Sequence, residues 1–441
     1  MSSAIRALLS AILISLLSSV TGAAKSSDWL VIENGTVIDV KAGKAVPGQS
    51  VTIRGPKIVA VGEVPENVPE DAERYAAGGK FIIPGLWDMH VHALWHEDVV
   101  DPFFTLFVAH GVTGVRDMGG KPELLKSVVE GELGRNAWTP LLYVAGPILD
   151  GPEPLNPDES IALATPKAGR DAVRKLKEWG VDFAKVYTTL PPPVFKAVAR
   201  AARDHDLGLA GHLPAGIPIG EAAAAGMRSI EHMVTERGGY CPATNRTDCA
   251  EKFRLLKGHG IHQTPTLVVR HRRSFVDAPG HDYADKLRLV PPFVQTYWQR
   301  YRERRAAEPV AQKKARRADY DHTKWMAAAL IETGVPMLAG TDAGLPFVLP
   351  GLSLHEELQR LVIAGMSPAQ ALRTATLEAA QFTGFEFSGQ VAPGMMADLV
   401  ILRRNPLERI RYTASIEAVV RFGHLHRRAE LDAEIERLRK Q

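Results

Sequence analysis

Five side chains of the kinds that divalent metal ions take as ligands each follow a short apolar run of this sequence. They are His90, His92, His212, His232 and Asp342. Alternate residues of a strand point to the same side, so the imidazoles of His90 and His92 face one space if the run Phe81–Asp88 continues through them. Imidazole and carboxylate groups suit a metal ion of borderline softness. The spacing therefore predicts a metal centre.

The size of this ligand set argues for two metal ions rather than one, because a single catalytic ion needs only three protein ligands and a water molecule. Lys185, in the run Val181–Tyr187, would place a cationic amine among the metal charges. That placement is unfavourable unless the amine is neutralised or made anionic. Carboxylation by carbon dioxide would turn Lys185 into a bidentate anionic bridge. We therefore expect two divalent ions, with zinc as the first choice, and a carboxylated Lys185.

Each candidate also has a simpler interpretation when it is taken alone. A single buried histidine is more often a hydrogen-bonded core residue than a ligand, and a single lysine is more often salt-bridged. The combination, with each residue placed after a separate apolar run, favours the metal-site interpretation. His262 and His355 stay undecided; His355 begins a helix after the last apolar run and could contact the site from behind.

The elements that must position these residues alternate between short apolar runs and helical stretches such as Asp171–Trp179 and Pro193–His205. Eight such runs predict an α/β fold, a (β/α)8 TIM barrel, which we place at residues 83–387. Catalytic residues of such barrels lie at the carboxyl ends of the strands, where the candidates are found. The runs are Phe81–Asp88, Thr113–Arg116, Leu141–Ala145, Phe183–Tyr187, Leu209–Gly211, Ser229–Glu231, Thr264–Val269 and Pro336–Gly340.

Strand-rich segments flank the barrel at both ends. Residues 25–82 and 388–426 carry short alternating apolar segments broken by turn residues. The two segments are remote in sequence but have the same alternating apolar pattern. They therefore predict a small β-sandwich subdomain assembled from both termini. Residues 427–441 place Leu431, Ile435 and Leu438 at helical spacing, which predicts a terminal helix.

The segment Tyr283–Ala329, between the seventh and eighth runs, is long, helical and basic. Acidic residues interleave its arginines and lysines, so a solvated helical face is favoured over a nucleic-acid-binding patch. Its Tyr297, Trp298 and Tyr301 could cover the barrel mouth as a lid. The formal net charge of +3 is also too small to indicate a nucleic-acid partner or a membrane surface.

The N-terminus has the features of a secretion signal. Arg6 precedes the apolar run Ala7–Val20, and the small residues 22–24 provide a cleavage point. The run is short for a membrane span. We therefore expect residues 1–24 to be removed and the protein to be secreted or periplasmic, with no membrane association afterwards. Cys241 and Cys249 could pair in such a compartment or remain thiols.

The motifs together resemble the amidohydrolase superfamily, specifically its imidazolonepropionase-like branch with Xaa-Pro dipeptidase-like members. The resemblance implies the barrel and composite β-sandwich, with His90 and His92 on a more buried metal ion and His212 and His232 on a more exposed one. It also implies that carboxylated Lys185 bridges the ions, while Asp342 ligates the first ion and transfers protons. The matching stretches are Pro84–His92, Gly111–Gly119, Lys185–Tyr187, Ala210–Pro214, Ser229–His232, Gly340–Ala343, Gly365–Thr376 and Val391–Asp398.

This resemblance implies an enzyme that hydrolyses a C–N amide bond by attack of a metal-bridging hydroxide, and the predicted signal adds that the enzyme is exported. Asp342 would act first as general base and then as general acid. Tyr187 could donate a hydrogen bond to the developing oxyanion, or only pack in the barrel. The expected substrates are small amides such as dipeptides and N-acyl amino acids. We also expect a homo-oligomer.

Other functions stay open for such a site. A lactonase, an esterase or a phosphotriesterase could use the same hydroxide. Deaminases of the superfamily carry a glutamate three residues after the histidine of the fifth strand, where this chain has Ala215, so deamination is disfavoured. Dipeptidases often have His-Ala-Tyr where this chain has His212-Leu-Pro214, which leaves a dipeptide preference open. A non-catalytic binding protein would be expected to have lost a ligand, and all six are present.

Overall fold

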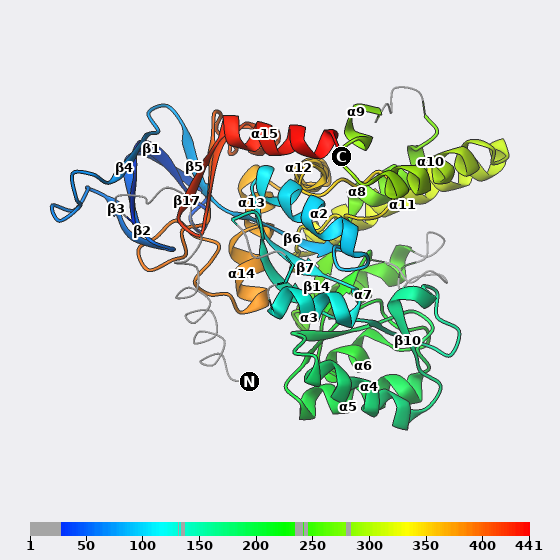
Figure 1. The fold of residues 1–441 in the computed structure, drawn as a ribbon. Coiled ribbons are helices and arrows are strands. Elements are labelled where there is room, and N and C mark those ends of the chain that lie inside the picture. Colours follow the sequence, from blue (N-terminus) through cyan, green and yellow to red (C-terminus); the bar gives the residue numbers. More distant parts are fainter. Residues whose placement is uncertain (1–27, 131, 134–136, 234–240, 242–245, 279–283) are drawn as a thin grey trace.

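A computed structural model describes residues 28–441 except 131, 134–136, 234–240, 242–245 and 279–283 (Figure 1). The predicted signal, residues 1–24, lies outside the described residues. None of the helices in the described part of the chain combines the length and the apolar character needed to cross a membrane.

The two ends of the chain share one mixed β-sheet (Figure 1). Strand β5 pairs in parallel with β1 on one side and antiparallel with β15 on the other, where Leu399 faces Pro84. The sheet follows the order β17-β16-β15-β5-β1-β2-β3, and β4 pairs with β1. Its strands are β1 (Trp29–Asp39), β2 (Lys44–Arg54), β3 (Lys57–Gly62), β4 (Glu73–Ala76), β5 (Phe81–Pro84), β15 (Leu399–Leu402), β16 (Ile416–Arg421) and β17 (His424–Arg427).

This terminal sheet curls on itself. The amide of Ile58 in β3 donates to the carbonyl of Met395 at 2.9 Å, which brings the far edge of the sheet back to the segment before β15. The enclosed side chains, including Ile32, Val51 and Leu399, form a separate apolar cluster. The expected β-sandwich therefore takes the form of one continuous curled sheet, and β5 crosses the predicted boundary at residue 82.

The middle of the chain contributes parallel strands that carry the candidate site. The amide of Asp182 donates to the carbonyl of Val144 at 2.9 Å, and Val186 pairs with Leu149, so β8 and β9 together act as one strand beside β11. The strands are β6 (Leu86–Val91), β7 (Val112–Asp117), β8 (Leu141–Val144), β9 (Ile148–Asp150), β11 (Phe183–Val186), β12 (Gly208–Gly211), β13 (Met227–Glu231) and β14 (His262–Thr264). The short β10 (Ser160–Ala162) adds to β9.

An irregular segment, residues 336–343, closes these strands into a ring of eight parallel segments. The amide of Leu338 donates to Gln263 of β14, and the amide of Met89 in β6 donates to Ala339, at 2.9 and 2.8 Å. Bridges Gln263–Met337 and Val91–Ala343 have the same parallel sense. This segment is the eighth predicted run, although it forms bridges rather than a regular strand.

Two of the predicted runs differ from the strands of the structure. The run Phe81–Asp88 divides between β5 of the terminal sheet and β6 of the ring. The bounds of the predicted seventh strand, Thr264–Val269, were wrong. Strand β14 ends at Thr264, and the apolar residues Leu267, Val268 and Val269 begin helix α8 (Leu267–Phe275) instead. The side-chain carboxyl group of Glu357 accepts hydrogen bonds from the amides of Leu267 and Val268, which compensates for the low helix propensity of the valines.

Helices cover the outside of the ring (Figure 1). The predicted stretches Asp171–Trp179 and Pro193–His205 lie largely in α4 and α5, and α15 occupies the predicted terminal segment, where Leu431 and Leu438 are buried. The helices are α2 (Glu97–Ala109), α3 (Pro122–Glu130), α4 (Pro166–Glu178), α5 (Pro192–Asp204), α6 (Ile219–Ala224), α7 (Arg246–Gly258), α8 (Leu267–Phe275), α9 (Ala284–Leu287), α10 (Pro292–Ala306), α11 (Val310–Thr333), α12 (Leu352–Ile363), α13 (Pro368–Thr374), α14 (Leu377–Thr383) and α15 (Arg428–Arg439). The described residues also form 3-10 turns at Pro157–Glu159 and Ile410–Ala414.

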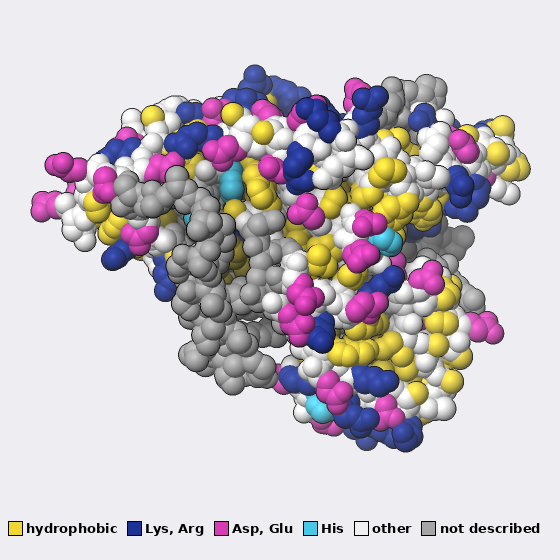
Figure 2. Space-filling view, viewed as in Figure 1, with side chains coloured by type: hydrophobic (Ala, Val, Ile, Leu, Met, Phe, Trp, Pro, Cys, Tyr) yellow, Lys and Arg dark blue, Asp and Glu magenta, His cyan; other side chains and the backbone are white. Residues whose placement is uncertain are grey.

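Helices α10 and α11 form the projecting pair at the right of Figure 1. Trp298 of α10 is fully buried, with its ring 5.7 Å from that of Phe347, and Tyr297 is half exposed. Phe293 contacts the ring of His96, which follows the predicted ligand His92. Helix α10 therefore lies against segments that leave the ring at the site end; its action as a lid stays a prediction. Figure 2 shows basic and acidic side chains interspersed on the visible face.

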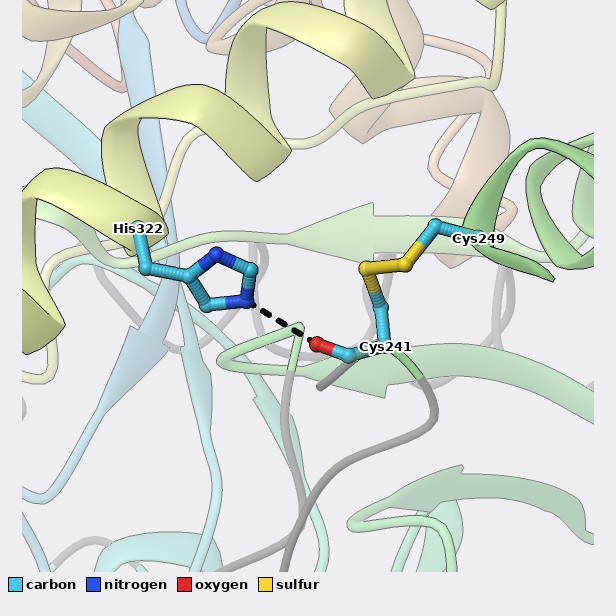
Figure 3. The surroundings of a disulfide bond; sticks show 3 residues. All are labelled: Cys241, Cys249 and His322. Atoms are coloured by element: carbon cyan, nitrogen blue, oxygen red, sulfur yellow. Dashed lines mark hydrogen bonds between the residues drawn. A yellow bond between two sulfur atoms is a disulfide. The ribbon is translucent and has the colours of Figure 1, made fainter. Parts of the chain in front are cut away.

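Cys241 and Cys249 form a disulfide, which resolves the alternative left by the sequence (Figure 3). Both side chains are buried, and their Cα atoms are 5.1 Å apart. Nε2 of His322 in α11 donates to the carbonyl oxygen of Cys241 at 2.9 Å. The disulfide thus joins α7 to the loop that follows β13, and the histidine ties that loop to α11.

Candidate metal centre

The first two candidate ligands leave the buried strand β6 with their Nε2 atoms directed at one carboxylate. His90 Nε2 lies 3.5 Å from Asp342 Oδ1, and His92 Nε2 lies 3.4 Å from the same oxygen. On the other side of the His90 ring, Nδ1 donates to Glu231 at 2.9 Å. His92 Nδ1 lies 3.4 Å from Glu159 Oε2. The Glu231 carboxylate holds the proton of His90 at Nδ1, so Nε2 of His90 keeps a lone pair for a metal ion, and Glu159 lies on the corresponding side of His92 without a hydrogen bond to its Nδ1.

His232 follows the same rule with a hydroxyl group in place of the carboxylate. Its Nδ1 lies 2.6 Å from Thr266 Oγ1, and that hydroxyl donates its own proton to the carbonyl of Pro265 at 2.8 Å. Thr266 must therefore accept the proton of His232 Nδ1, which leaves the Nε2 lone pair 3.9 Å from Asp342 Oδ2. His232, Thr266 and Asp342 all have left-handed backbone angles, with φ of 63°, 48° and 66°. Such strain is concentrated at functional sites.

His212 completes the set from the end of β12. Its Nδ1 is hydrogen-bonded to Thr188 Oγ1 at 2.8 Å. Its Nε2 and that of His90 are buried and have no hydrogen-bond partner within the described residues. The His212 ring lies 5.0 Å from that of His232, which in turn lies 4.6 Å from that of His90. The four imidazoles thus form one group rather than two separate pairs.

Lys185 enters this group from β11 and is almost completely buried. Its Nζ lies 5.3 Å from the centre of the Tyr187 ring, and that ring stacks on His212 with centroids 3.9 Å apart. Burial lowers the pKa of Lys185, although Asp342 and Glu231 oppose the change. An amine with a lowered pKa is more often unprotonated, and the unprotonated amine is the form that reacts with carbon dioxide.

Burial shifts the pKa values of three of the histidines and of Asp342, whereas the pKa of His92 is raised against burial by Glu159 and Asp342. Burial is the largest cause of the strongly lowered pKa of His90, His212 and His232, and the charge of Lys185 lowers each further. These imidazoles are therefore neutral, which is the form that binds metal ions. Burial also raises the pKa of Asp342, against the opposing charges of His92 and Lys185.

The chain leaves room for these groups through glycines in the closing segment. A Cβ atom on Gly340 would lie 2.5 Å from Thr264 Cγ2 and 2.8 Å from the amide nitrogen of His90. Only glycine permits residues 336–343 to approach β6 and β14 this closely, and that approach places Asp342 beside the imidazoles. The ligand atoms of His90, His232 and Asp342 consequently lie within 4.8 Å of one another.

These residues fit a metal centre by a simple chemical test. A buried nitrogen lone pair without a hydrogen-bond donor costs free energy. Here several imidazole lone pairs lie close to the carboxylate of Asp342 and the amine of Lys185. A divalent cation is the partner that would satisfy nitrogen lone pairs and a carboxylate at the same point. The Nε2 atoms of His90, His92 and His232 lie 3.4–3.9 Å from Asp342, and His212 contacts His232, so these predicted ligands lie together.

A buried ion pair behind His90 was not anticipated from the sequence. Arg116 donates from Nη2 to both oxygens of Glu231, at 2.9 and 2.8 Å, and to Thr264 Oγ1 at 3.0 Å. Its Nε donates to the carbonyl of Met89 at 2.6 Å, and its Nη1 to Ser229. Arg116 thus neutralises Glu231 and fixes the carboxylate that orients His90.

Sequence reasoning also missed Glu159, Thr188 and Thr266. Glu159 comes from a 3-10 turn in the segment after β9, which has no apolar run to mark it. The two threonines follow strands β11 and β14 directly, so the strand-end rule that found the histidines could have found them.

The two histidines that were left undecided lie elsewhere. His355 is hydrogen-bonded to Thr413 Oγ1 and to the carbonyl of His110, at 2.9 and 3.0 Å. His262 begins β14, at the end of the ring opposite the site, with its ring 5.1 Å from that of Phe382.

Tyr187 lies in the predicted position but has an alternative partner. Its hydroxyl accepts a hydrogen bond from Asn156 Nδ2 at 3.3 Å, and its ring covers His212. The tyrosine therefore faces the site, and the hydrogen bond from Asn156 uses an oxygen lone pair of the hydroxyl rather than its proton.

Comparison with known proteins gives a family and several relatives. The sequence pattern of the "Amidohydrolase family" matches residues 81–425. Ochratoxinase of Aspergillus niger is 22% identical over 453 residues, which cover 88% of this chain and 85% of the relative. Adenine deaminase of Rubrobacter xylanophilus is 31% identical over 169 residues, but this match covers only 35% of this chain and 25% of the deaminase.

Solved structures share the fold along nearly the whole chain. A bottromycin amidohydrolase is 25% identical with a TM-score of 0.75, and the match covers 98% of this chain and 93% of that one. A Xaa-Pro dipeptidase solved with bound methionine in its active site is 21% identical with a TM-score of 0.69, covering 90% of this chain and all of that one.

Proposed function

Because this chain belongs to the amidohydrolase family and is a metal-dependent hydrolase acting on C–N bonds, we propose that it cleaves a small amide at a centre holding two divalent ions. The observation that carries the proposal is the convergence of imidazoles whose Nδ1 atoms are engaged and whose Nε2 atoms face Asp342 and one another. We expect His90, His92, His212, His232, Asp342 and a carboxylated Lys185 to hold the ions, with zinc as the first choice.

Two such ions would lower the pKa of a bound water molecule and polarise a carbonyl group. The chain's own residues supply the rest of the chemistry. Asp342 is buried, and its raised pKa suits it to take a proton and pass it to the leaving amine. The hydroxyl of Tyr187 donates a hydrogen bond to the oxygen that gains charge. Burial of the site excludes water that would weaken both interactions.

Dipeptides, N-acyl amino acids and related amides are the proposed substrates. The full-length likeness to an ochratoxinase and the fold of a Xaa-Pro dipeptidase support an amide over other acyl compounds. Lactones, esters and phosphotriesters are the second class, because the same centre could act on them. The partial likeness to an adenine deaminase is not matched at the residue that deamination needs, since Ala215 occupies that place.

The test is a hydrolysis screen with the purified protein. Amides, lactones, phosphotriesters and adenine are assayed side by side before and after removal of metal ions with a chelator. We expect amide cleavage that is lost on chelation and restored by zinc. Ammonia release from adenine without amide cleavage would refute the proposal.

Export and assembly are proposals of the same kind. We propose that residues 1–24 are removed during export, which N-terminal sequencing of the mature protein tests; a retained Met1 would refute it. We propose a homo-oligomer, which light scattering tests.

A further inference from the structure

Asp150 ends strand β9 and carries a carboxylate that has no role in the centre described above. Its side chain is completely buried at the carboxyl end of its strand, the end of the ring at which the candidate ligands lie. The hydrogen bonds that it accepts come from two loops. One loop, residues 151–159, follows β9, and the other, residues 187–191, follows β11. Asp150 therefore holds two loops at the site end of the ring.

The first oxygen of this carboxylate holds the loop after β11. Oδ1 accepts hydrogen bonds from the amide and from the hydroxyl group of Thr189, at 3.0 and 2.7 Å. The amide of Tyr187 donates to the carbonyl of Leu149 at 3.0 Å. Thr188, the residue between them, is therefore fixed on both sides, and its hydroxyl group is hydrogen-bonded to His212 Nδ1 at 2.8 Å.

The second oxygen holds the loop after β9. Oδ2 accepts a hydrogen bond from the amide of Leu155 at 3.0 Å. The next residue, Asn156, donates from Nδ2 to the hydroxyl group of Tyr187 at 3.3 Å. The carbonyl of Asn156 accepts a hydrogen bond from the amide of Glu159 at 3.2 Å, and Glu159 lies beside His92. The same carboxylate therefore fixes the loop that supports both Tyr187 and His92.

The two loops also pack directly against each other. A Cβ atom on Gly151 would lie 2.3 Å from the carbonyl oxygen of Thr189, so only glycine permits this approach. The amide of Gly151 donates to Asp150 Oδ1 at 2.9 Å. A carboxylate suits the junction because it has only acceptor sites, and here it meets three amides and one hydroxyl group.

We propose that Asp150 is a positioning residue for the hydrolysis of the substrate amide. Its Oδ1 holds Thr188 against His212, and its Oδ2 holds Asn156 against Tyr187. This inference rests on the proposed function, in which His212 binds a metal ion and Tyr187 donates to the oxygen that gains charge. The two oxygens then control different properties. Loss of the Oδ1 bonds frees the His212 ring and weakens metal binding, whereas loss of the Oδ2 bond displaces the tyrosine hydroxyl and lowers kcat.

Two substitutions of Asp150 in the full chain separate these effects. Asp150→Ala removes both oxygens, so the affinity for zinc and kcat should each fall about tenfold. Asp150→Asn keeps one oxygen, which we expect at the Oδ1 position because more donors meet there, and it turns an NH2 group toward the amide of Leu155. This variant should restore zinc affinity to within about twofold of the unmodified protein, while kcat stays about tenfold low and KM changes little.

A second background shows whether the loss of kcat passes through Tyr187. The hydroxyl group that Asp150 positions is already absent in Tyr187→Phe. Adding Asp150→Asn to that variant should therefore lower kcat by less than about twofold further. A loss as large as in the unmodified background would overturn the inference, because it would show that Asp150 acts on turnover by another route.

Asp182→Asn is the matched control. Asp182 Oδ2 accepts a hydrogen bond from the amide of Val144 at 2.8 Å, so it also links neighbouring strands, but at the start of β11 rather than beyond its end. This variant should leave zinc affinity and kcat within about twofold of the unmodified values. Equal losses in Asp182→Asn and Asp150→Ala would overturn the inference, because they would indicate a role in the fold alone.

Zinc affinity is measured by competition with a chelator and needs no turnover, so it can be read even if the hydrolysis screen fails. A chain that binds no zinc would refute the proposed function. A chain that binds zinc equally well with and without the Asp150 carboxylate would refute this inference alone. If Asp150→Ala does not fold, Thr189→Val is measured in its place, because it removes the hydroxyl donor to Oδ1. It should weaken zinc binding by at least about threefold, and unchanged binding would overturn the inference.

Discussion

At the scale of single residues, the hydrogen-bond partner of each histidine Nδ1 determines whether the Nε2 of the same ring has a lone pair for a metal ion. His90 and His92 have carboxylates at Nδ1, and His212 and His232 have threonine hydroxyls. Each arrangement leaves Nε2 directed into the group. The partners of these nitrogens are therefore as necessary to the proposed centre as the ligands are.

The pair formed by Glu231 and Arg116 gives the first prediction. Glu231→Gln keeps the shape of the side chain but removes the charge that holds the His90 proton, and it leaves Arg116 buried without an anion. We expect metal affinity to fall about 10- to 100-fold and the unfolding free energy to fall by about 3 kcal/mol. Competition with a chelator and denaturant unfolding measure the two effects.

Glu178→Gln, which alters an exposed glutamate of α4, is the control and should leave both quantities unchanged. If Glu231→Gln bound metal ions as tightly as the unmodified protein, the contact of Glu231 with His90 Nδ1 would not support metal binding.

The candidate ligands could be predicted from sequence because each one follows a strand and strands of a parallel ring end at one rim. Their supporting residues could not, since Arg116 and Glu231 are 115 positions apart and only the folded ring brings them together. Glu159 is a further case, because the turn that carries it has no periodic pattern. The proposed carboxylation of Lys185 also has no signature beyond the burial of this residue among imidazoles.

At the scale of elements, the start of α8 joins the site to helix α12. The sequence predicted a strand here because Val268 and Val269 favour strands, and it could not show that Glu357, 90 positions away, would satisfy the helix amides. Separation in sequence also explains why the terminal sheet was expected as a sandwich. The alternating apolar pattern of its strands can be read from the sequence, but the contact of β3 with Met395 cannot.

Glu357 gives a pH-dependent prediction. Burial raises its pKa to about 8, although its two amide donors lower it. A carboxyl whose pKa is raised in the folded state stabilises the fold below its ordinary range, and that stabilisation is lost as the pH rises through 8. Between pH 7 and 9 the unfolding free energy should fall about 1 kcal/mol more for the unmodified protein than for Glu357→Gln, which cannot ionise.

Denaturant unfolding at several pH values measures this difference. A difference of the opposite sign, or none, would show that Glu357 is already ionised at neutral pH.

The disulfide gives a prediction about stability without catalysis. Cys241→Ser combined with Cys249→Ser should lower the unfolding free energy by about 2–3 kcal/mol, because the unfolded chain regains a short loop. Turnover should stay within about twofold, since neither cysteine is one of the predicted ligands. Unfolding and amide hydrolysis are measured on the same preparation, and a collapse of turnover would show that this loop also positions His232.

At the scale of the whole molecule, the terminal sheet is fastened to the ring by a buried ion pair. Arg421 of β16 pairs with Asp398 at 2.5 Å and donates from Nε to the carbonyl of Thr139, just before β8, at 2.8 Å. The carbonyl of Asp398 accepts the amide of Gly85, just before β6. This pair therefore connects the C-terminal part of the terminal sheet to the segments that precede ring strands β6 and β8, which lie on either side of β7.

Arg421→Leu should lower the unfolding free energy by about 3 kcal/mol, because Asp398 stays buried without a cation. Adding Asp398→Asn should recover much of the loss, since removing both charges is far less costly than removing one. Metal content at full occupancy should not change in either variant. Denaturant unfolding and metal analysis check these results; a double variant less stable than the single one would contradict the account.

The central claim is that four imidazoles, Asp342 and Lys185 hold two divalent ions at one end of the ring of strands. Metal quantification on the purified chain and on Lys185→Ala tests it most directly. We predict about two equivalents per chain for the unmodified protein, and about one or fewer with amide cleavage abolished for the variant. Full activity with a single equivalent, or two equivalents and unchanged turnover without Lys185, would contradict it.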